Sequence, residues 1–586
     1  MRKKSSPLKM TAVIIAFLAV FCIAAGTLSN FHENLVVLQK IAVSVKQKYV
    51  IDVDTDELVE AAVEGMKEVL DPHTSYFSPK DFSRFMESTK GKFGGLGIQI
   101  GIREKALTII TPLPGTPAYR MGILAGDKII EINGKPTKGI TINEAVNKLR
   151  GKVGTEVDIT IDREGEKKPL EYTIERELVE VHPVDYSGMI EKDVGFIKLV
   201  QFSDESTNEV RQAVNELMEA GAKGIILDLR NNPGGLLTKA VEISDLFLEE
   251  EKLIVYTRGR IKQSNVDHYS KGPAIVPEGF PVVVLLNYGS ASASEIVAGA
   301  IQDYDRGVIL GRTSYGKGSV QTFENLENKK AIKITTAYYY TPSGRCINKP
   351  ENQAGHPLDE DEENPEDDSA GAVDADSTES IPDSLKFRTE GGRTVFGDGG
   401  ITPDIDIKPD FLKGIEAAME RKSFFFRFAI KYIASLKAGG REITKEFEVT
   451  DEILKKFRDF LKETNFSYEM VAEKSLDDLQ ETLINEIKVN KGLAEEDSLL
   501  TKTENQEQIM ALIEKIDNHF EKEKEHAFDQ SVDYIKFAIK REIMVSTFGA
   551  DMRYVLSLPR DSYVKEAVSI LHNTERYNSI VSPDKK

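Results

Sequence analysis

The chain has 586 residues, 40% of them hydrophobic, and a formal net charge of −20. Single cores rarely grow beyond about 250–300 residues, so several domains are expected. The acidic balance argues against a nucleic-acid-binding protein, which needs a basic surface. Two cysteines, Cys22 and Cys346, are too few for a disulfide framework or a cysteine-based metal site.

Residues 1–26 have the pattern of a targeting segment. Arg2 and Lys4 precede an apolar run from Met10 to Ala25, which is short for a bilayer-spanning helix but typical of a secretory signal. Small residues at its end suit cleavage, and an uncleaved membrane anchor is the alternative. In either case we expect the rest of the chain in the periplasm or otherwise outside the cytoplasm.

The next two regions differ in periodicity. Residues 27–90 are predicted to be helical, because Leu35, Leu38 and Ile41 fall at helical spacing. Residues 91–181 are predicted to form short strands and turns, including a strand that ends in the turn Asn133-Gly134. Within this region Thr141 is placed to cap a helix that carries Ala145, Val146 and Leu149 on one face.

An α/β pattern follows over residues 182–420. Apolar strands are predicted at 224–229 and 282–286, and a helix at 292–302. Alternation of strands and helices predicts a mixed sheet with crossover helices. The fold class is therefore α/β multidomain, with the N-terminal helical segment in front and a C-terminal helical region behind.

Two further regions carry no catalytic pattern. Residues 352–398 include dense acidic runs and are predicted to be a disordered insertion, either a solvated loop or a regulatory or cation-binding segment. Residues 421–586 are predicted to be helical, with Val532, Ile535, Ile539 and Ile543 as a stripe that belongs to a helix-bundle core.

The strongest chemical signal is the segment 287–296, which reads NYGSASASEI and follows a buried strand. A helix that starts here supplies unpaired amides and positive potential, which suit a developing oxyanion. Ser290, Ser292 and Ser294 are all candidate nucleophiles on chemistry alone. The alternative is a serine-rich helix start that serves only capping and packing.

A nucleophilic serine needs a base. Of the eight histidines, none lies in a glycine-rich turn near this helix, whereas Lys317 lies between Gly316 and Gly318. A lysine in a dry pocket can lose its proton and act as a base, and Gln321, four positions on, is placed to orient its amine. The alternative is an ordinary exposed turn.

A third motif follows the strand predicted at 224–229 and contains Pro233-Gly234-Gly235. Glycines free backbone amides to face a bound carbonyl oxygen, although a purely structural turn is equally compatible with the motif. A phosphate-binding loop is the rival, but no Gly-Lys-Ser/Thr follows.

Together these motifs resemble the C-terminal processing peptidases, also called tail-specific proteases, which are serine proteases with a Ser-Lys dyad. The matching segments are LRNNPGG at 229–235, GSASASE at 289–295 and YGKGSVQ at 315–321. The resemblance implies Ser292 as nucleophile, Lys317 as general base 25 positions later, and Gln321 as the third catalytic residue. Ala293 with Gly234 or Gly235 would form the oxyanion hole, and no metal or cofactor is implied.

Residues 91–181 then resemble a PDZ domain, whose glycine-rich loop binds the terminal carboxylate of a peptide that adds a strand. The expected partners are thus proteins with accessible C-terminal tails, and the N-terminal segment is a possible membrane tether. A non-catalytic PDZ adapter with a protease-like core is the rival function. The residues expected to bind the peptide are Gly95, Leu96, Gly97, Ile98, Val146 and Leu149.

Overall fold

The computed structural model describes residues 31–349, 382–470, 472–476, 478–482 and 504–582. The targeting segment expected at 1–26 lies outside these residues, as does most of the acidic insertion. The described chain divides into two compact units, one of residues 31–82 with 321–336 and one of the remaining described residues. No helix within the described ranges is long and apolar enough to cross a membrane.

The smaller unit is mostly helical, as its periodicity predicts. A helix at residues 31–48 is followed by α2 (Thr55–Lys67), and the chain then forms β1 (Ser75–Phe77). Strand β1 pairs antiparallel with β18 (Ala331–Tyr340), which also pairs with β17 (Ser319–Asn325). The aromatic rings of Phe77, Phe82 and Phe323 pack at this pairing, with centroids 6.0–6.3 Å apart. The helix α3 (Pro79–Lys90) leads out of this unit.

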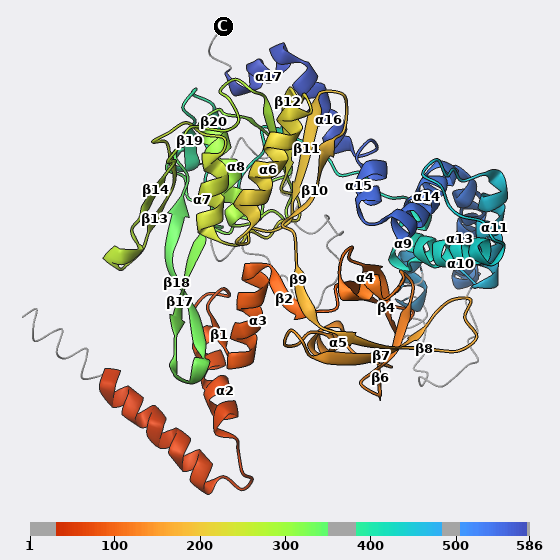
Figure 1. Ribbon diagram of the computed structural model, residues 1–586, viewed down its shortest axis with the longest axis horizontal. Coiled ribbons are helices and arrows are strands. Elements are labelled where there is room, and N and C mark those ends of the chain that lie inside the picture. The colour runs from red at the N-terminus through yellow and green to blue at the C-terminus, as the bar shows by residue number, and fades with distance from the viewer. Residues whose placement is uncertain (1–30, 350–381, 471, 477, 483–503, 583–586) are drawn as a thin grey trace, which may run out of the picture. The chain divides into compact units, whose positions relative to one another are not determined.

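Residues 92–180 form the expected strand-rich domain, an antiparallel sheet of order β3-β4-β5-β7-β8 (Figure 1). The predicted Asn133-Gly134 turn has positive φ at both residues, which is the geometry that this dipeptide favours in hairpins. Thr141 caps α5 (Ile142–Leu149), and Glu144 completes a capping box. The strands are β3 (Ile98–Arg103), β4 (Ala106–Pro112), β5 (Lys128–Ile132), β7 (Glu156–Asp162) and β8 (Leu170–Glu175). The first and last strands of the domain, β2 (Lys92–Gly95) and β9 (Glu177–Glu180), pair with each other in a separate two-stranded ribbon.

The core sheet has six strands in the order β10-β11-β12-β15-β16-β21, and all neighbours except β10 and β11 are parallel. Continuous apolar runs form its centre, because both faces are covered. The strands are β10 (Val184–Met189), β11 (Val194–Leu199), β12 (Gly224–Asp228), β15 (Val282–Leu286), β16 (Val308–Gly311) and β21 (Ile405–Asp406).

The two faces of the core sheet are covered by different parts of the chain. On one face, Ile225 and Leu227 pack against α6 (Ser206–Glu219), α7 (Leu237–Asp245) and α8 (Ala293–Asp303). On the other face, Phe196 and Ile226 pack against α16 (Ser562–His572) and α17 (Thr574–Val581), which reach this sheet from the far end of the chain (Figure 1). The last helices are therefore part of the α/β core, although the sequence assigned them to a C-terminal helical region.

The other C-terminal helices build a core of their own. Ile535, Ile539 and Ile543 are fully buried there, as the apolar stripe predicts, and they pack with Phe425 and Phe457. The helices of this bundle are α9 (Gly414–Arg421), α10 (Phe424–Ala438), α11 (Asp451–Glu463), α13 (Glu504–Gln530) and α14 (Val532–Phe548).

Part of the range 352–398 is ordered, contrary to the expectation of disorder. Strands β19 (Lys386–Arg388) and β20 (Thr394–Phe396) form an antiparallel hairpin. The acidic runs end before this hairpin, and its own apolar residues find a core, because Val395 is 3% exposed. An ion pair of Arg393 with Asp404 (2.7 Å) fixes it further.

Candidate active site

Two loops meet where neighbouring parallel strands end. Strands β12 and β15 pair in register, so the oxyanion loop (residues 230–235) lies beside the serine turn (residues 287–292). Asn231 and Asn287 join the loops by two hydrogen bonds, since the Asn231 amide donates to Asn287 Oδ1 at 2.8 Å and Asn287 Nδ2 donates to Asn231 Oδ1 at 2.7 Å. An added Cβ on Gly289 would lie 2.7 Å from Asn231 Oδ1, so this close approach requires a glycine.

The three serines of the turn have different environments. Ser290 and Ser294 are fully buried, and their hydroxyls donate at 2.9 Å to the carbonyls of Leu229 and Asn232. Ser292 is half-buried and has a φ of 54°, a conformation that non-glycine residues rarely adopt. Backbone strain of this kind costs about 1–3 kcal/mol and clusters at active sites. The environment thus separates Ser292 from its two neighbours, which chemistry alone could not do.

Ser292 is also the N-cap residue of α8, and every residue of that helix is buried. The unpaired amides and the dipole of this helix favour negative charge at its start. The Ser292 side chain therefore lies where a developing oxyanion is stabilised.

Glu295 joins the serine turn to the lysine loop (residues 312–318). Its carboxylate is fully buried and accepts from the amides of Ser292 (2.7 Å), Gly316 (2.7 Å) and Lys317 (3.0 Å), and from the Ser314 hydroxyl (2.5 Å). Burial raises the pKa of Glu295, and these four donors oppose that rise. One carboxylate thus fixes the backbone on both sides of the site. From the sequence this residue looks like an ordinary capping glutamate, and its wider role was missed.

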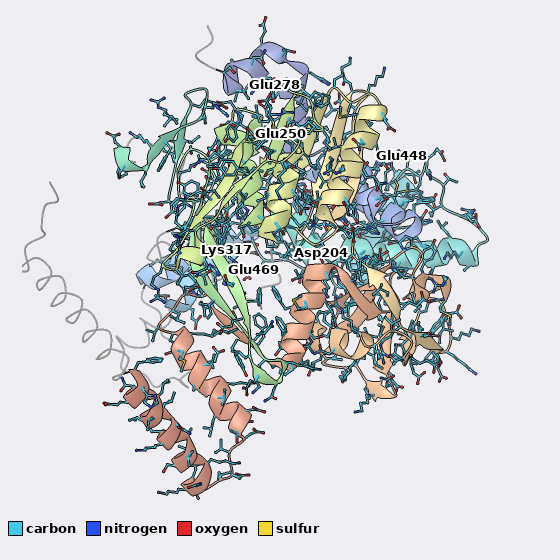
Figure 2. All side chains as sticks on the ribbon, turned by 60° about the vertical axis from the view of Figure 1, so that its left-hand side comes forward. Asp204, Glu250, Glu278, Lys317, Glu448 and Glu469 are labelled. Carbon is cyan, nitrogen blue, oxygen red and sulfur yellow. The ribbon has the colours of Figure 1, made fainter. Side chains whose placement is uncertain are left out.

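Lys317, which is labelled in Figure 2, is half-buried in the lysine loop just before β17. Its flanking glycines permit close packing, because an added Cβ would lie 2.7 Å from Lys349 Cγ at Gly316 and 2.7 Å from the Asn348 amide nitrogen at Gly318. The amides of Lys317 and Ser292 donate to the same Glu295 oxygen, so the backbones of the predicted base and nucleophile are adjacent.

Tyr339 is a further residue at the site that the sequence did not single out. Its phenol donates to the Lys317 carbonyl. Burial raises the pKa of Tyr339 well above its ordinary value, which keeps the phenol neutral. Its strand carries three successive tyrosines, and nothing in the local pattern separates Tyr339 from the other two.

The predicted oxyanion donors lie together at the serine turn. An added Cβ on Gly234 would be 2.8 Å from Ser292 Cβ and 2.9 Å from the Ala293 amide nitrogen. The Gly234 amide itself donates to Asn232 Oδ1 at 3.0 Å, so it is already engaged. The amides of Gly235 and Ala293 donate no hydrogen bond to any described residue. The geometry therefore favours Gly235 over Gly234 as the glycine donor.

Gln321 lies on β17, in the smaller unit. Its amide nitrogen donates to the Thr335 hydroxyl at 3.3 Å, and Thr335 donates to Asp71 Oδ1 at 3.0 Å. Burial raises the pKa of Asp71, but hydrogen bonds from Thr74, His73 and Thr335 outweigh it, so the net shift is downward. The role of Gln321 in orienting Lys317 stays a prediction.

The residues expected to bind a peptide divide into two groups. Leu96 and Leu149 are 2% and 4% exposed and belong to the core of their domain. Ile98 and Val146 are half-buried, and they lie on β3 and α5. Strand β3 is the edge of its sheet and has α5 beside it, and Gly95 and Gly97 lie in the segment that leads into β3. An extended peptide can therefore pair with β3, and Val146 is more accessible than the buried Leu149.

No group of three or more His, Cys, Asp or Glu side chains in the described ranges is arranged to hold a metal ion. What the arrangement can do follows from its parts, which are a strained serine, a lysine whose backbone is adjacent to it, and two unpaired amides, Ala293 at a helix start and Gly235 in the oxyanion loop. This combination suits acyl transfer.

Comparison with known proteins agrees with this chemistry. The family model "Peptidase family S41" matches residues 193–354, and a PDZ-domain model matches residues 108–163. A third model, "Probable PDZ-protease, C-terminal helical domain", matches 415–502 and 484–571.

Named relatives are similar over the same region. The carboxy-terminal-processing protease of Bartonella bacilliformis is 42% identical over 322 residues, which cover 54% of this chain and 73% of that protein. The carboxy-terminal processing protease CtpA of Bacillus subtilis is 34% identical over 347 residues, which cover 58% of this chain and 73% of that protein. Among solved structures, the photosystem II D1 C-terminal processing protease is 27% identical and has a TM-score of 0.31, with coverage of 53% of this chain and 90% of that one.

Proposed function

The chain belongs to the carboxy-terminal processing proteases of peptidase family S41, and on this premise we propose that Ser292 is the nucleophile of its serine endopeptidase activity and Lys317 the general base. One observation carries the proposal. Of the three serines in the turn, only Ser292 is half-buried and strained, and its backbone shares the Glu295 carboxylate with Lys317.

In the proposed reaction, neutral Lys317 accepts the proton of the Ser292 hydroxyl while the serine oxygen attacks a peptide carbonyl. The carbonyl oxygen becomes an oxyanion, to which Ala293 and Gly235 donate their amides. Lys317 then protonates the leaving amine as the C–N bond breaks. Water, deprotonated by Lys317, hydrolyses the acyl-enzyme and restores the serine. Gln321 holds the lysine amine in position.

The PDZ domain supplies recognition of the substrate tail. Its open strand β3 supports addition of the substrate's C-terminus as an extra strand, with the terminal carboxylate at the amides of residues 95–98. A bond elsewhere in the tail is then cut at Ser292. The substrates are accordingly proteins whose C-terminal tails are accessible.

The test compares three single substitutions in the full chain on an unstructured protein substrate. Ser292→Ala should abolish cleavage, whereas Ser290→Ala and Ser294→Ala should keep measurable activity, because they remove only a buried hydrogen bond worth about 1 kcal/mol. Cleavage by purified Ser292→Ala protein would refute the assignment. No cleavage by the unaltered chain, with tail binding retained, would support the rival function of a non-catalytic PDZ adapter.

We propose further that the enzyme works outside the cytoplasm, because residues 1–26 combine a basic start with a short apolar run. Fractionation of a Gram-negative host that expresses the full chain tests this idea. Protein in the periplasm or on the periplasmic side of the membrane supports it, and protein confined to the cytoplasm contradicts it. N-terminal sequencing of the same material separates a cleaved signal from a retained tether.

A further inference from the structure

The oxyanion loop begins at Arg230, which forms ion pairs with Asp228 and with a residue close to the end of the chain, Asp561. Arg230 lies two residues after the end of β12, and its guanidinium donates to Asp228 Oδ2 at 2.6 Å and to Asp561 Oδ2 at 2.8 Å. A second bond, from Nη1 to Asp561 Oδ1 at 3.2 Å, makes the contact with Asp561 bidentate. Asp561 precedes α16, 331 residues after Arg230, and lies outside the residues that match the peptidase model.

Asp561 performs two tasks at once. It is the N-cap of α16, where its Oδ1 accepts from the amides of Tyr563 (2.9 Å) and Val564 (3.3 Å). The Tyr563 ring also lies against the guanidinium of Arg230, and the distance from Arg230 Cζ to the ring centroid is 4.9 Å. The start of α16 thus forms one wall of the Arg230 site.

Charges of both signs surround Arg230. Lys198 Nζ donates to Asp228 Oδ1 at 3.1 Å and to the Arg230 carbonyl at 2.5 Å. Lys198 and Arg230 face Asp228 and Asp561, and a third carboxylate, Asp185, which binds the Tyr554 phenol, also acts on the Lys198 charge. Removal of the Asp561 charge leaves Asp228 as the one carboxylate among the described residues that is hydrogen-bonded to Arg230, and a largely buried charge with fewer partners is costly.

The cluster is directly connected to the reaction centre through the oxyanion loop. Lys198 and Asp228 fix the Arg230 backbone, and two residues later Asn232 accepts the Ala291 amide (3.0 Å) and the Ser294 hydroxyl (2.9 Å) through its carbonyl. The loop then reaches Gly235, whose amide faces no described acceptor. A shift at Arg230 is therefore transmitted to the proposed oxyanion donor and to the serine turn.

We propose that Asp561 is a positioning residue for catalysis, through which the C-terminal helix α16 holds Arg230 and hence the oxyanion loop in its productive geometry. This inference rests on the proposed function and extends it, because it makes residues outside the peptidase match part of the catalytic unit. Because Asp561 acts through Arg230 and the oxyanion loop, we expect its loss to weaken stabilisation of the transition state and to leave tail binding unchanged.

Asp561→Asn is the informative substitution. Asparagine is as good an N-cap as aspartate, so α16 keeps its start while the charge opposite Arg230 is lost. The matched control is Asp193→Asn, which removes the charge of the residue that contacts His572 Nε2 (2.9 Å) at the other end of the same helix. The control weakens the docking of α16 without touching the oxyanion loop.

Four quantities are measured on the full chain: kcat and KM for a cleavable peptide, inhibition by a peptide aldehyde, and affinity for a free tail peptide. An aldehyde forms a tetrahedral adduct with the serine, so its affinity reports the oxyanion site. For Asp561→Asn we expect kcat to fall about tenfold, less than the hundredfold or more seen when an oxyanion donor is removed. Aldehyde affinity should fall in proportion, while KM and tail affinity stay within about twofold.

Asp561→Glu restores the charge and should recover part of the lost kcat. Unchanged kcat in Asp561→Asn, or an equal loss in Asp193→Asn, overturns the proposal, since the second result means that α16 needs only to be docked. A loss of tail affinity with unchanged kcat overturns it as well. Failure of the proposed function itself would show separately, as cleavage by Ser292→Ala.

Discussion

The core sheet and the PDZ sheet present their sites in opposite ways. In the core, parallel strands β12 and β15 end side by side, and the loops that follow them bring side chains together at Ser292. In the PDZ domain the proposed site is the open edge of β3, where backbone groups would pair with a substrate tail. Side-chain substitutions should therefore abolish the first activity but only adjust the second.

The largest effect that this comparison predicts is at the base. Lys317→Arg keeps the positive charge but cannot lose its proton, so peptidase activity should fall by at least about a thousandfold. Lys349→Arg is the matched control, because its cation lies 4.9 Å from the Tyr288 ring, a contact that arginine also makes. Burial lowers the pKa of Lys349, so an active Lys317→Arg enzyme with an inactive Lys349→Arg enzyme would move the base to Lys349.

The next effect is at the carboxylate that joins the two loops. In Glu295→Gln an NH₂ group replaces one carboxylate oxygen, so two of the four donors face a donor and lose their acceptor. Activity should fall about a hundredfold, and the free energy of unfolding should fall by about 2–4 kcal/mol. Glu416→Gln is the control, because Glu416 is a buried capping-box residue of α9 that accepts the Lys413 amide at 3.0 Å. Denaturant unfolding and peptide cleavage should show a small loss of stability and unchanged kcat for Glu416→Gln. Equal kcat in the two variants would reduce Glu295 to an ordinary cap.

A smaller effect is expected where backbone does the binding. Because the amides at residues 95–98 cannot be removed by substitution, the change is made on the ligand. Amidation of a tail peptide removes a charge and an acceptor, and its affinity for full-length Ser292→Ala protein should fall about tenfold or more, as expected for a charge-assisted bond of roughly 1.5–3 kcal/mol. Calorimetry with both peptides measures this ratio, and equal affinities would end the idea of tail recognition.

The smallest effect concerns the half-buried Val146 on α5. Val146→Ala removes two methyl groups, so the affinity for tails that end in an apolar residue should fall only severalfold, in line with about 1 kcal/mol or less of apolar contact. Asn143→Ala, an exposed change on the same helix, should have no effect. A loss of tail binding in Val146→Ala larger than that caused by amidation would reverse the comparison between backbone and side chains.

How much the sequence could predict depended on how local each signal was. The strand Val282–Leu286 has the bounds expected from its apolar run, since a buried parallel strand needs nothing more. The hairpin of β19 and β20 was missed, because the acidic runs before it dominate the composition of the range. Helix α16 was predicted as a helix, but its partner surface was not, since an apolar face does not identify what covers it.

The site shows the same limit. Residue chemistry alone left Ser290, Ser292 and Ser294 as equal candidates, and family resemblance was needed to choose. The physical reason for the choice lies in the carbonyls of Leu229 and Asn232, about sixty residues earlier, which occupy the other two hydroxyls. Glu295 was missed for a similar reason, because its partners in the lysine loop follow about twenty residues later.

The covering of the core sheet by α16 and α17 has a consequence for biosynthesis. Strands β11 to β16 leave the ribosome well before residues 562–581, and at about 5–20 residues per second this interval lasts on the order of tens of seconds. During that time one face of the sheet, with Phe196 and Val283, is not yet covered by helices. Arg230 also lacks the side-chain carboxylate of Asp561. A nascent chain should thus need chaperone protection and should not yet digest its neighbours. Ribosome-bound chains arrested before residue 562 should be cut within the core by added protease, whereas the released full-length chain should resist it.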